Sequence, residues 1–309
     1  MSAANHSKEL CMNRPLLAAA AIALTAFAVG CASPAGGADQ PVASAEAIAS
    51  RAAIEAAVAN AARPAEHVAR DASRHPADSL AFWGLEPGMD ILEIAPGGEA
   101  WWTHILAPFA RDTNGAYTAT AADLNNPNLS PAARQARADW EARFVAPGAL
   151  GPINLVNFGA VSAPLPAQSY DFILTARSIH GFIGQNIVDK VFVDFYGALR
   201  PGGHLAVEQH RAPATVSVTD TAWMTANGYV PEAFVIAAAE RAGFEFVGRS
   251  DINANPADDH DHPFGVWTLP PTRRSAPAGQ PADPAFDLAP YDAIGESDRM
   301  TLLFRRPAA

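Results

Sequence analysis

Lysine is almost absent from this sequence of 309 residues. Only Lys8 and Lys190 occur, so arginine supplies nearly all of the positive charge, and the formal net charge is −11. A P-loop needs a lysine beside its glycines, and a nucleic-acid groove needs an excess of basic side chains to neutralise phosphates. The composition therefore excludes a P-loop and argues against a nucleic-acid partner.

Cysteine is also scarce, because Cys11 and Cys31 are the only two and both lie near the N-terminus. Residues 32–309 therefore contain no disulfide framework, no cysteine-rich zinc site and no thiol nucleophile. An acidic chain without thiols suits an oxidising compartment. What the chain does have is 49% hydrophobic residues over a length sufficient for a large core.

The N-terminus has the pattern of an export signal. Residues 1–14 are polar and include Lys8 and Arg14, and an apolar, alanine-rich run follows over residues 16–29. A charged start, a short apolar run and small residues before a cleavage point predict a signal peptide over residues 1–30. The apolar run is too short to span a membrane comfortably.

The end of that run resembles a bacterial lipoprotein signal, in which small residues lead directly into a cysteine. Cys31 would then be the first mature residue and would anchor the chain by its lipid on the periplasmic side of the envelope. Ala28 stands where such signals more often place leucine, so an ordinary signal peptide with an incidental Cys31 is the alternative. Residues 31–42 are small and predict a flexible tether, and we expect the folded body to begin near Ala43.

Beyond the tether, apolar runs alternate with helical periodicities. Residues 43–75 predict N-terminal helices, and helices are also expected over 76–83, 101–111, 130–144, 188–199 and 231–242. Strands are expected over 89–95, 116–122, 153–158, 170–175, 204–209, 244–249 and 300–305. Such alternation predicts an α/β fold with a doubly wound parallel sheet that is covered on both faces. Residues 250–298 are rich in proline without a clear period, which indicates a lid, a wrapping loop or disorder, and Phe264-Gly265-Val266-Trp267 indicates that at least part of the segment packs.

Ligands of such sheets bind at the carboxyl ends of the strands. After the first strand, Gly97 and Gly98 let the backbone approach a ligand, and we expect the buried Glu93 to order this loop. Asp123 follows the second strand, where an acid suits the ribose hydroxyls of a nucleoside. Phe158 ends the third strand and offers a flat side chain that could flank a base.

With these features in this order, the chain resembles the class I S-adenosylmethionine-dependent methyltransferases over most of residues 76–249. The more specific motifs are Tyr170-Asp171-Phe172-Ile173-Leu174 and Leu199-Arg200-Pro201-Gly202-Gly203. Within that class, the chain resembles bacterial predicted methyltransferases with an Arg-Pro and His-Pro start and a Ser-Asp-Arg-Met end. The matching residues here are Arg63-Pro64, His75-Pro76 and Ser297-Asp298-Arg299-Met300.

The resemblance implies a Rossmann-like sheet of seven strands whose last strand, residues 300–305, is antiparallel. It also implies S-adenosylmethionine as cofactor and a small-molecule acceptor that the sequence does not identify. His180 and His210 would lie where the acceptor meets the methyl group, either as general bases or as hydrogen-bonded cleft histidines. Arg177 either binds an acidic acceptor or pairs with a local carboxylate.

The glycine loop departs from the class, which would place glycines at positions 95, 97 and 99. This sequence has Ala95, Gly97 and Glu99. One interpretation is that the loop still binds the cofactor, with Glu99 helping to hold its cationic groups. The other is that Glu99 only favours a helix N-terminus, in an envelope lipoprotein that is a binding protein or is catalytically inactive.

Residues 258–262 read Asp-Asp-His-Asp-His, and carboxylates and imidazoles are suitable metal ligands. Adjacent residues in one loop do not readily complete a coordination sphere, so we expect a solvated acidic loop and no metal site. The sequence predicts no particular oligomeric state.

Overall fold

The computed structural model describes residues 44–308, and the predicted signal peptide, Cys31 and the whole predicted tether lie outside the described residues. Within them, seven strands form one sheet in the order β3-β2-β1-β4-β5-β7-β6. The strands are β1 Ile91–Ile94, β2 Tyr117–Ala122, β3 Asn154–Phe158, β4 Tyr170–Ala176, β5 Leu199–His210, β6 Glu245–Ser250 and β7 Arg299–Arg305. The predicted Rossmann-like sheet is confirmed.

The strand directions place the carboxyl ends of β1 to β5 at one edge. These five strands pair in parallel, whereas β7 pairs antiparallel with both β5 and β6, as the resemblance implied. β1 is central, with Glu93 opposite Ala119 on one side and Leu174 on the other. Residues that follow β1, β2, β4 and β5 therefore meet at this edge.

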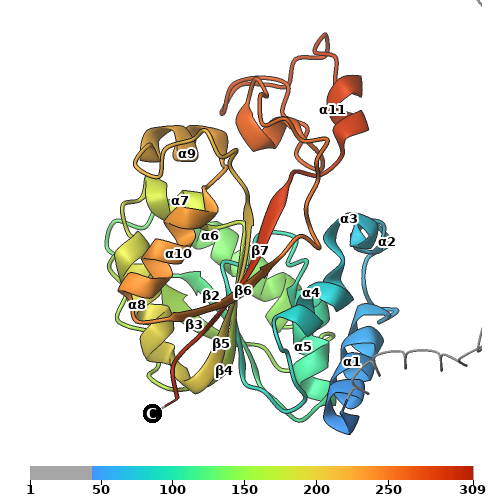
Figure 1. Cartoon of the computed structure of the whole chain (residues 1–309), viewed down its shortest axis with the longest axis vertical. Coiled ribbons are helices and arrows are strands. Elements are labelled where there is room, and N and C mark those ends of the chain that lie inside the picture. The colour runs from blue at the N-terminus through green and yellow to red at the C-terminus, as the bar shows by residue number, and fades with distance from the viewer. Residues whose placement is uncertain (1–43, 309) are drawn as a thin grey trace, which may run out of the picture. The chain divides into compact units, whose positions relative to one another are not determined.

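Helices cover both faces of the sheet, with α1, α4 and α5 on one side and α8 and α10 on the other (Figure 1). Several have local start signals: the Ser44 hydroxyl caps α1, and Ser130 caps α6 with Pro131 in its first turn. The α-helices are α1 Ala45–Val58, α2 Ala65–Val68, α3 Asp71–Arg74, α4 Pro76–Phe82, α5 Thr103–Asp112, α6 Pro131–Trp140, α7 Ile179–Gly184, α8 Val188–Ala198, α9 Thr221–Asn227, α10 Glu232–Arg241 and α11 Ala289–Ile294.

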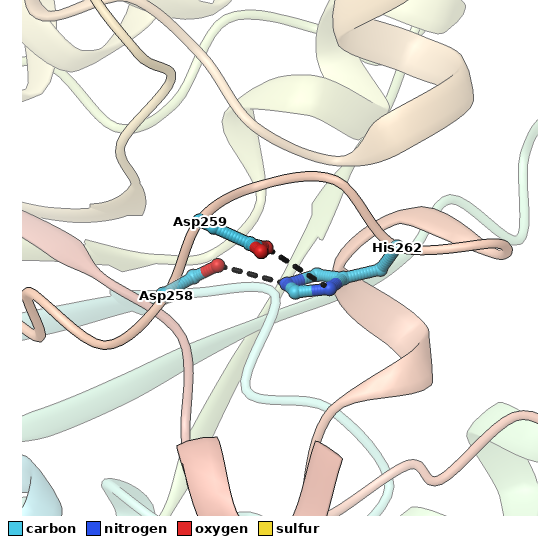
Figure 2. Close-up of side chains that lie close together, drawn as sticks. All are labelled: Asp258, Asp259 and His262. Atoms are coloured by element: carbon cyan, nitrogen blue, oxygen red, sulfur yellow. Dashed lines mark hydrogen bonds and ion pairs between the residues drawn. The ribbon is translucent and has the colours of Figure 1, made fainter. Parts of the chain in front are cut away.

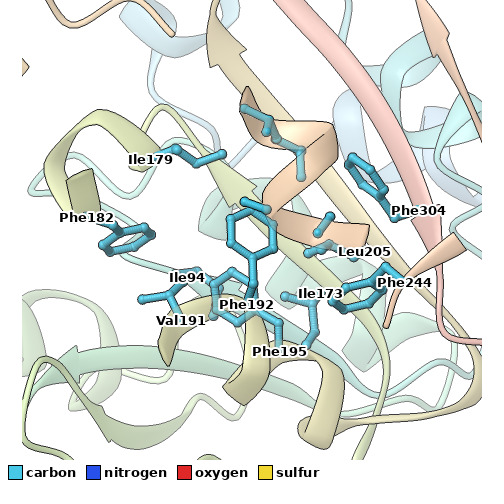
Figure 3. Close-up of a cluster of buried hydrophobic side chains, with 14 of the residues drawn as sticks. Ile94, Ile173, Ile179, Phe182, Val191, Phe192, Phe195, Leu205, Phe244 and Phe304 are labelled. Carbon is cyan, nitrogen blue, oxygen red and sulfur yellow. The ribbon is translucent and has the colours of Figure 1, made fainter. Parts of the chain in front are cut away.

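Two apolar layers lie on opposite faces of the sheet because successive strand residues point to opposite sides. Ile91 belongs to the layer under α1, α4 and α5, and Leu92 belongs to the other layer. Figure 3 shows part of the second layer, in which Phe192 and Phe195 of α8 meet Ile173 and Leu205 of the sheet. Burial of these layers is the main stabilising contribution to the fold.

The 251–298 segment, which joins β6 to β7, contains a 3₁₀ turn at Gly265–Thr268 and the short helix α11. Figure 1 shows the segment beyond the end of the sheet at which β7 begins, and α3 lies near the same end. Its buried side chains include those of Asn253, Asp258 and Leu269, so much of it is packed. Among residues 44–308, no helix is both long enough and apolar enough to cross a membrane.

Candidate active site

The loop after β1 keeps a glycine-like backbone although one expected glycine is replaced. Ala95 has φ +49° and Gly97 has φ +73°, both in the left-handed region. The Ala95 amide donates a hydrogen bond to Thr120 Oγ1 of β2 at 2.8 Å, which holds the turn. A Cβ atom on Gly97 or Gly98 would meet nothing within 4 Å, so this side of the loop faces open space. The loop thus retains the room that a close-lying ligand needs.

Glu93 orders the base of this loop, as predicted from its position. It is buried, and its Oε2 accepts hydrogen bonds from Thr103 Oγ1 at 2.9 Å and Tyr117 Oη at 2.5 Å. Burial raises the pKa of Glu93 to about 7, although the two hydroxyl donors oppose this shift. Glu93 therefore ties β1 to the start of α5 and to β2, and it also lines a cavity.

Two cavities flank the loop, and both are lined by Ala95, Pro96 and Gly97. The first, here called the polar cavity, has a volume of about 260 Å³ and extends toward β4 and β5. Its polar lining consists of Glu93, Arg177, Ser178, His180, His210, Thr272, Glu296 and Ser297. The second, the apolar cavity, has a volume of about 350 Å³ and is lined by β2 and α6. An elongated ligand across Gly97 would enter both.

The α6 helix closes the apolar cavity. Trp140 Nε1 donates to the Gly97 carbonyl at 3.1 Å, and Arg137 Nη1 donates to the Ala122 carbonyl at 2.6 Å and also to Asn157 Oδ1. Thr120, Ala121 and Ala122 provide the β2 wall, and alanines of α6 provide the opposite wall. This cavity is flat-sided and largely apolar, with a polar rim at Arg137, which suits an aromatic base.

Of the residues that the sequence predicted to bind the cofactor, three line a cavity and two do not. Glu93 and Gly97 line the polar cavity, and Gly97 and Gly98 line the apolar one. Asp123 is buried directly after β2, where its Oδ1 accepts the Asn125 amide at 2.9 Å, and it lines neither cavity. Phe158 packs in the core, with its ring 6.0 Å from that of Phe195.

Glu99 does not face either cavity. Its side chain is 67% exposed and pairs with Arg143 Nη2 at 3.2 Å. The suggestion that Glu99 holds cationic groups of a cofactor therefore receives no support from its location.

His180 and His210 come together in the polar cavity, with ring centroids 6.0 Å apart. His180 follows β4, and His210 ends β5, where its Nδ1 lies 2.6 Å from Ser297 Oγ. Burial lowers the pKa of His180 to about 4 and lowers the pKa of His210 well below its ordinary value. Both imidazoles are therefore neutral at physiological pH.

Buried arginines and glutamates form a cluster beside this cavity. Glu296 accepts hydrogen bonds from Arg70, Arg74 and Arg299 at 2.6 to 3.0 Å. Burial would raise the pKa of Glu296, but the positive charges of Arg74 and Arg299 outweigh it and hold that pKa at about 2. Arg299 also lies 3.1 Å from Glu208. Sequence reasoning missed this cluster.

The motifs at the two ends of the body make ion pairs and hydrogen bonds near this cluster. Arg63 forms a two-pronged ion pair with Asp71, and Arg299 Nη2 donates to the Ser73 carbonyl at 2.5 Å. Asp298 likewise accepts both Nε and Nη2 of Arg211, each at 2.8 Å. Arg299 thus joins α3 to the start of β7, whereas Arg63 pairs within the helices before β1.

The Asp258-Asp259-His262 cluster in the 251–298 segment has ligand atoms within 4.8 Å of one another (Figure 2). Asp258 is buried, and its oxygens accept hydrogen bonds from Tyr229 Oη, His262 Nε2 and the amides of His260 and Asp298. These donors already use the acceptor directions that a cation would need. Asp258 therefore acts as an anchor for the segment, and only Asp259 is exposed.

Comparison with known proteins identifies the central part of the chain. Residues 92–207 match a family model described as a methyltransferase domain. The chain therefore contains a class I methyltransferase domain, whose cofactor is S-adenosylmethionine. No curated protein matches the chain significantly.

Solved structures with similar folds include three methyltransferases or proteins described as such. A putative sarcosine dimethylglycine methyltransferase from Galdieria sulphuraria is 14% identical over 78% of this chain and 88% of its own, with a TM-score of 0.48. An S-adenosylmethionine-dependent methyltransferase from Methanosarcina mazei is 12% identical over 73% and 95%, with a TM-score of 0.43. A putative methyltransferase from Bacillus halodurans is 15% identical over 75% and 98%, with a TM-score of 0.44.

Proposed function

We propose that this protein transfers a methyl group from S-adenosylmethionine to a small-molecule acceptor in the polar cavity. The observation that carries the proposal is the loop of residues 95–98, which keeps its left-handed turns and lies between two cavities. Together with the methyltransferase domain match over residues 92–207, this arrangement supports cofactor binding despite the altered glycine pattern.

The residues present fit this cofactor. The apolar cavity beside α6 suits the adenine, and the carboxylate of Asp123 at the end of β2 is proposed to bind the ribose hydroxyls. Glu93 and the loop would hold the amino-acid part at the polar cavity, where a buried carboxylate favours cationic groups. The bound cofactor supplies an activated methyl group with a good leaving group. Phe158 is not part of this proposal, because its ring packs in the core.

The protein itself then has to align the acceptor and exclude water. Trp101, Val266 and Trp267 provide apolar walls to the polar cavity, and Pro270 and Pro271 add to them. Four of these five residues, Val266, Trp267, Pro270 and Pro271, belong to the 251–298 segment and precede α11. This segment therefore shapes the acceptor site. His210 is the candidate general base for an acceptor that must lose a proton.

We also propose that the chain is exported and anchored through a lipid on Cys31, so that this chemistry takes place at the envelope. The support is the sequence pattern of residues 1–31. Because the cofactor is made in the cytosol, an envelope protein that binds a ligand without transferring a methyl group is the second candidate. The altered glycine pattern at Ala95 and Glu99 is the sequence feature that supports this second candidate, although Ala95 keeps the left-handed backbone.

Calorimetric titration of S-adenosylmethionine and S-adenosylhomocysteine into the mature chain, residues 32–309, tests the proposal. Micromolar binding, about −8 kcal/mol, is expected if the loop still functions. Absence of heat with a protein shown to be folded by circular dichroism would contradict it and would favour the binding-protein candidate.

A further inference from the structure

Arg177 is the first residue after β4 and is held in an unusual conformation. Its φ is +56°, a left-handed value that is costly for a residue with a side chain. Its amide donates to the Glu208 carbonyl at 2.7 Å, which fixes the backbone against β5. The side chain of the residue held in this conformation lines the polar cavity.

The guanidinium of Arg177 has no partner among residues 44–308. None of its nitrogens donates a hydrogen bond there, no carboxylate lies within 4.0 Å, and its Nε is buried without a partner. Sequence reasoning left two roles open for Arg177, an acidic acceptor or a local carboxylate. No local carboxylate forms an ion pair with Arg177 within the described residues. Glu296 is bound by Arg70, Arg74 and Arg299, and Glu208, the neighbouring charge with the largest effect on the pKa of Arg177, lies beyond 4.0 Å.

Charge in this region is unbalanced. Arg74 and Arg299 are buried and Arg177 is half-buried near Glu208 and Glu296, and Arg70 pairs with Glu296. With Glu93, whose pKa Arg177 also affects, four arginines lie near three glutamates. A buried positive charge without a counterion is unfavourable, and an anionic ligand would relieve it.

His180 adds a neutral donor to the same cavity. Gln209 Oε1 accepts the Ile179 amide at 3.1 Å, so its Nε2 is the donor group. That Nε2 donates to the Gly228 carbonyl at 2.9 Å and lies 3.2 Å from His180 Nδ1. Nδ1 must then be the acceptor, and the proton of the neutral imidazole sits on Nε2. His180 therefore offers an N–H group rather than a basic lone pair at Nε2.

We propose that Arg177 and His180 form an anion-binding site for the acceptor, which carries a carboxylate or phosphate group. This inference rests on the proposed function and adds the substrate class. The guanidinium provides the charge and paired N–H donors, and the imidazole provides a further N–H. The anionic group is the anchor that positions the acceptor.

The surrounding walls favour the acceptor over the carboxylate of the cofactor itself. His210, Trp267 and Ser297 line the same cavity and lie outside residues 92–207, the part that matches the methyltransferase domain. Trp267 contacts His180 directly, with ring centroids 5.6 Å apart. Arg177 and His180 lie within the matched range, but these walls come from the end of β5 and from the 251–298 segment outside it, and we infer that they hold the acceptor.

The test is a calorimetric titration of inorganic phosphate and of propionate into the mature chain saturated with S-adenosylhomocysteine. Propionamide is the neutral control ligand. The variants are Arg177→Gln, Arg177→Lys and His180→Phe, with Arg241→Gln as the matched control, because Arg241 is exposed and pairs with Asp189 away from both cavities. S-adenosylhomocysteine affinity is measured for each variant first.

We expect the wild type and Arg241→Gln to bind at least one of the two anions and not propionamide. Arg177→Gln should lose tenfold or more in anion affinity, His180→Phe should lose about threefold to tenfold, and Arg177→Lys should fall between the wild type and Arg177→Gln. Tighter phosphate binding would indicate a phosphorylated acceptor, and tighter propionate binding a carboxylic acid.

Three results would overturn the inference: no anion binding by the wild type, unchanged binding by Arg177→Gln, or a tenfold loss of S-adenosylhomocysteine affinity in Arg177→Gln. The last would assign Arg177 to the carboxylate of the cofactor. Failure of the wild type to bind S-adenosylhomocysteine would instead contradict the proposed function, so the two failures are distinguishable.

Discussion

The Ala95 amide and the Thr120 hydroxyl, 2.8 Å apart, together hold the loop of the active site in a conformation that glycine normally adopts. Ala95 occupies φ +49°, where a Cβ atom costs about 1 kcal/mol or more. The hydrogen bond from β2 helps to offset this cost. The loop therefore survives the loss of a glycine because a neighbouring strand supports it.

Substitutions of Ala95 and Thr120 should change the free energy of unfolding in opposite directions. Ala95→Gly should leave the free energy of unfolding unchanged or raise it by up to about 1 kcal/mol, because it relieves the left-handed strain. Thr120→Val removes the acceptor of the Ala95 amide and should lower that free energy by about 1–2 kcal/mol. Urea unfolding measures both, and a stabilised Thr120→Val variant would contradict this account.

Asp123→Ala should abolish or strongly weaken nucleoside binding while leaving the fold intact. We expect the affinity for S-adenosylhomocysteine to fall at least tenfold, because the proposed partner of the ribose hydroxyls is lost. Asp112→Ala is the control, since Asp112 is an exposed acid at the end of α5 that pairs only with its neighbour Arg111. Equal affinities of the two variants would show that the ribose has been placed wrongly.

Glu93 should make the stability depend on pH. Its folded pKa of about 7 lies above the ordinary value of 4.5, so the folded state binds more protons between these values. Stability due to this carboxyl is therefore present below about pH 4.5 and is lost as pH rises through 7. Relative to Glu93→Gln, the wild type should lose about 2 kcal/mol between pH 5 and 7.5. Urea unfolding of both proteins isolates the effect from the histidines, and a constant difference would refute it.

Asp258 is predicted to anchor the 251–298 segment without a metal. Asp258→Asn should lower the free energy of unfolding by about 2–4 kcal/mol, because buried donors from Tyr229 and His262 lose a charged acceptor. Thermal unfolding of the wild type should be the same with EDTA as with added Zn²⁺. A clear rise in melting temperature with Zn²⁺, absent in Asp259→Ala, would instead indicate a metal site.

Cys31→Ser is predicted to leave the protein without lipid. The wild type should fractionate with membranes and the Cys31→Ser variant should not, because the lipid would be the membrane anchor. Metabolic labelling with a radioactive fatty acid measures the modification directly. Identical labelling and membrane fractions in Cys31→Ser would exclude the lipoprotein interpretation.

Most of the sheet and its helices could be predicted because their signals are local. The apolar run at 89–95 became β1 at Ile91–Ile94, and the periodicity at 188–199 became α8 at Val188–Ala198. The short helices α7 and α9 were not predicted, since helices of one or two turns depend on packing against neighbours rather than on a repeated apolar face. The 251–298 segment was expected as one long element without period, and its structure comes from buried polar contacts such as those of Asp258.

The site was predictable where it depends on strand ends and not where it depends on distant contacts. Glu93 lies near the end of β1 and Gly97 just after it, so the position of this strand in the sequence was enough to predict that both line the cavity. Phe158 is a strand end as well, but its side chain alternates to the face where α8 packs. The ion pairs of Glu296 with Arg70 and Arg74 join residues more than 200 positions apart, and no sequence spacing indicates them.

The buried arginine and glutamate cluster also sets the smallest piece of this protein that should fold alone. A fragment limited to residues 92–207, the part that matches the methyltransferase domain, would lack Arg74, Glu296 and Arg299 together. It would keep Arg177 but lose Glu208, and it would cut β5 before its end and leave that strand without its partner β7. The piece that can be excised as an independent unit must therefore extend from the Arg63 motif to the end of β7.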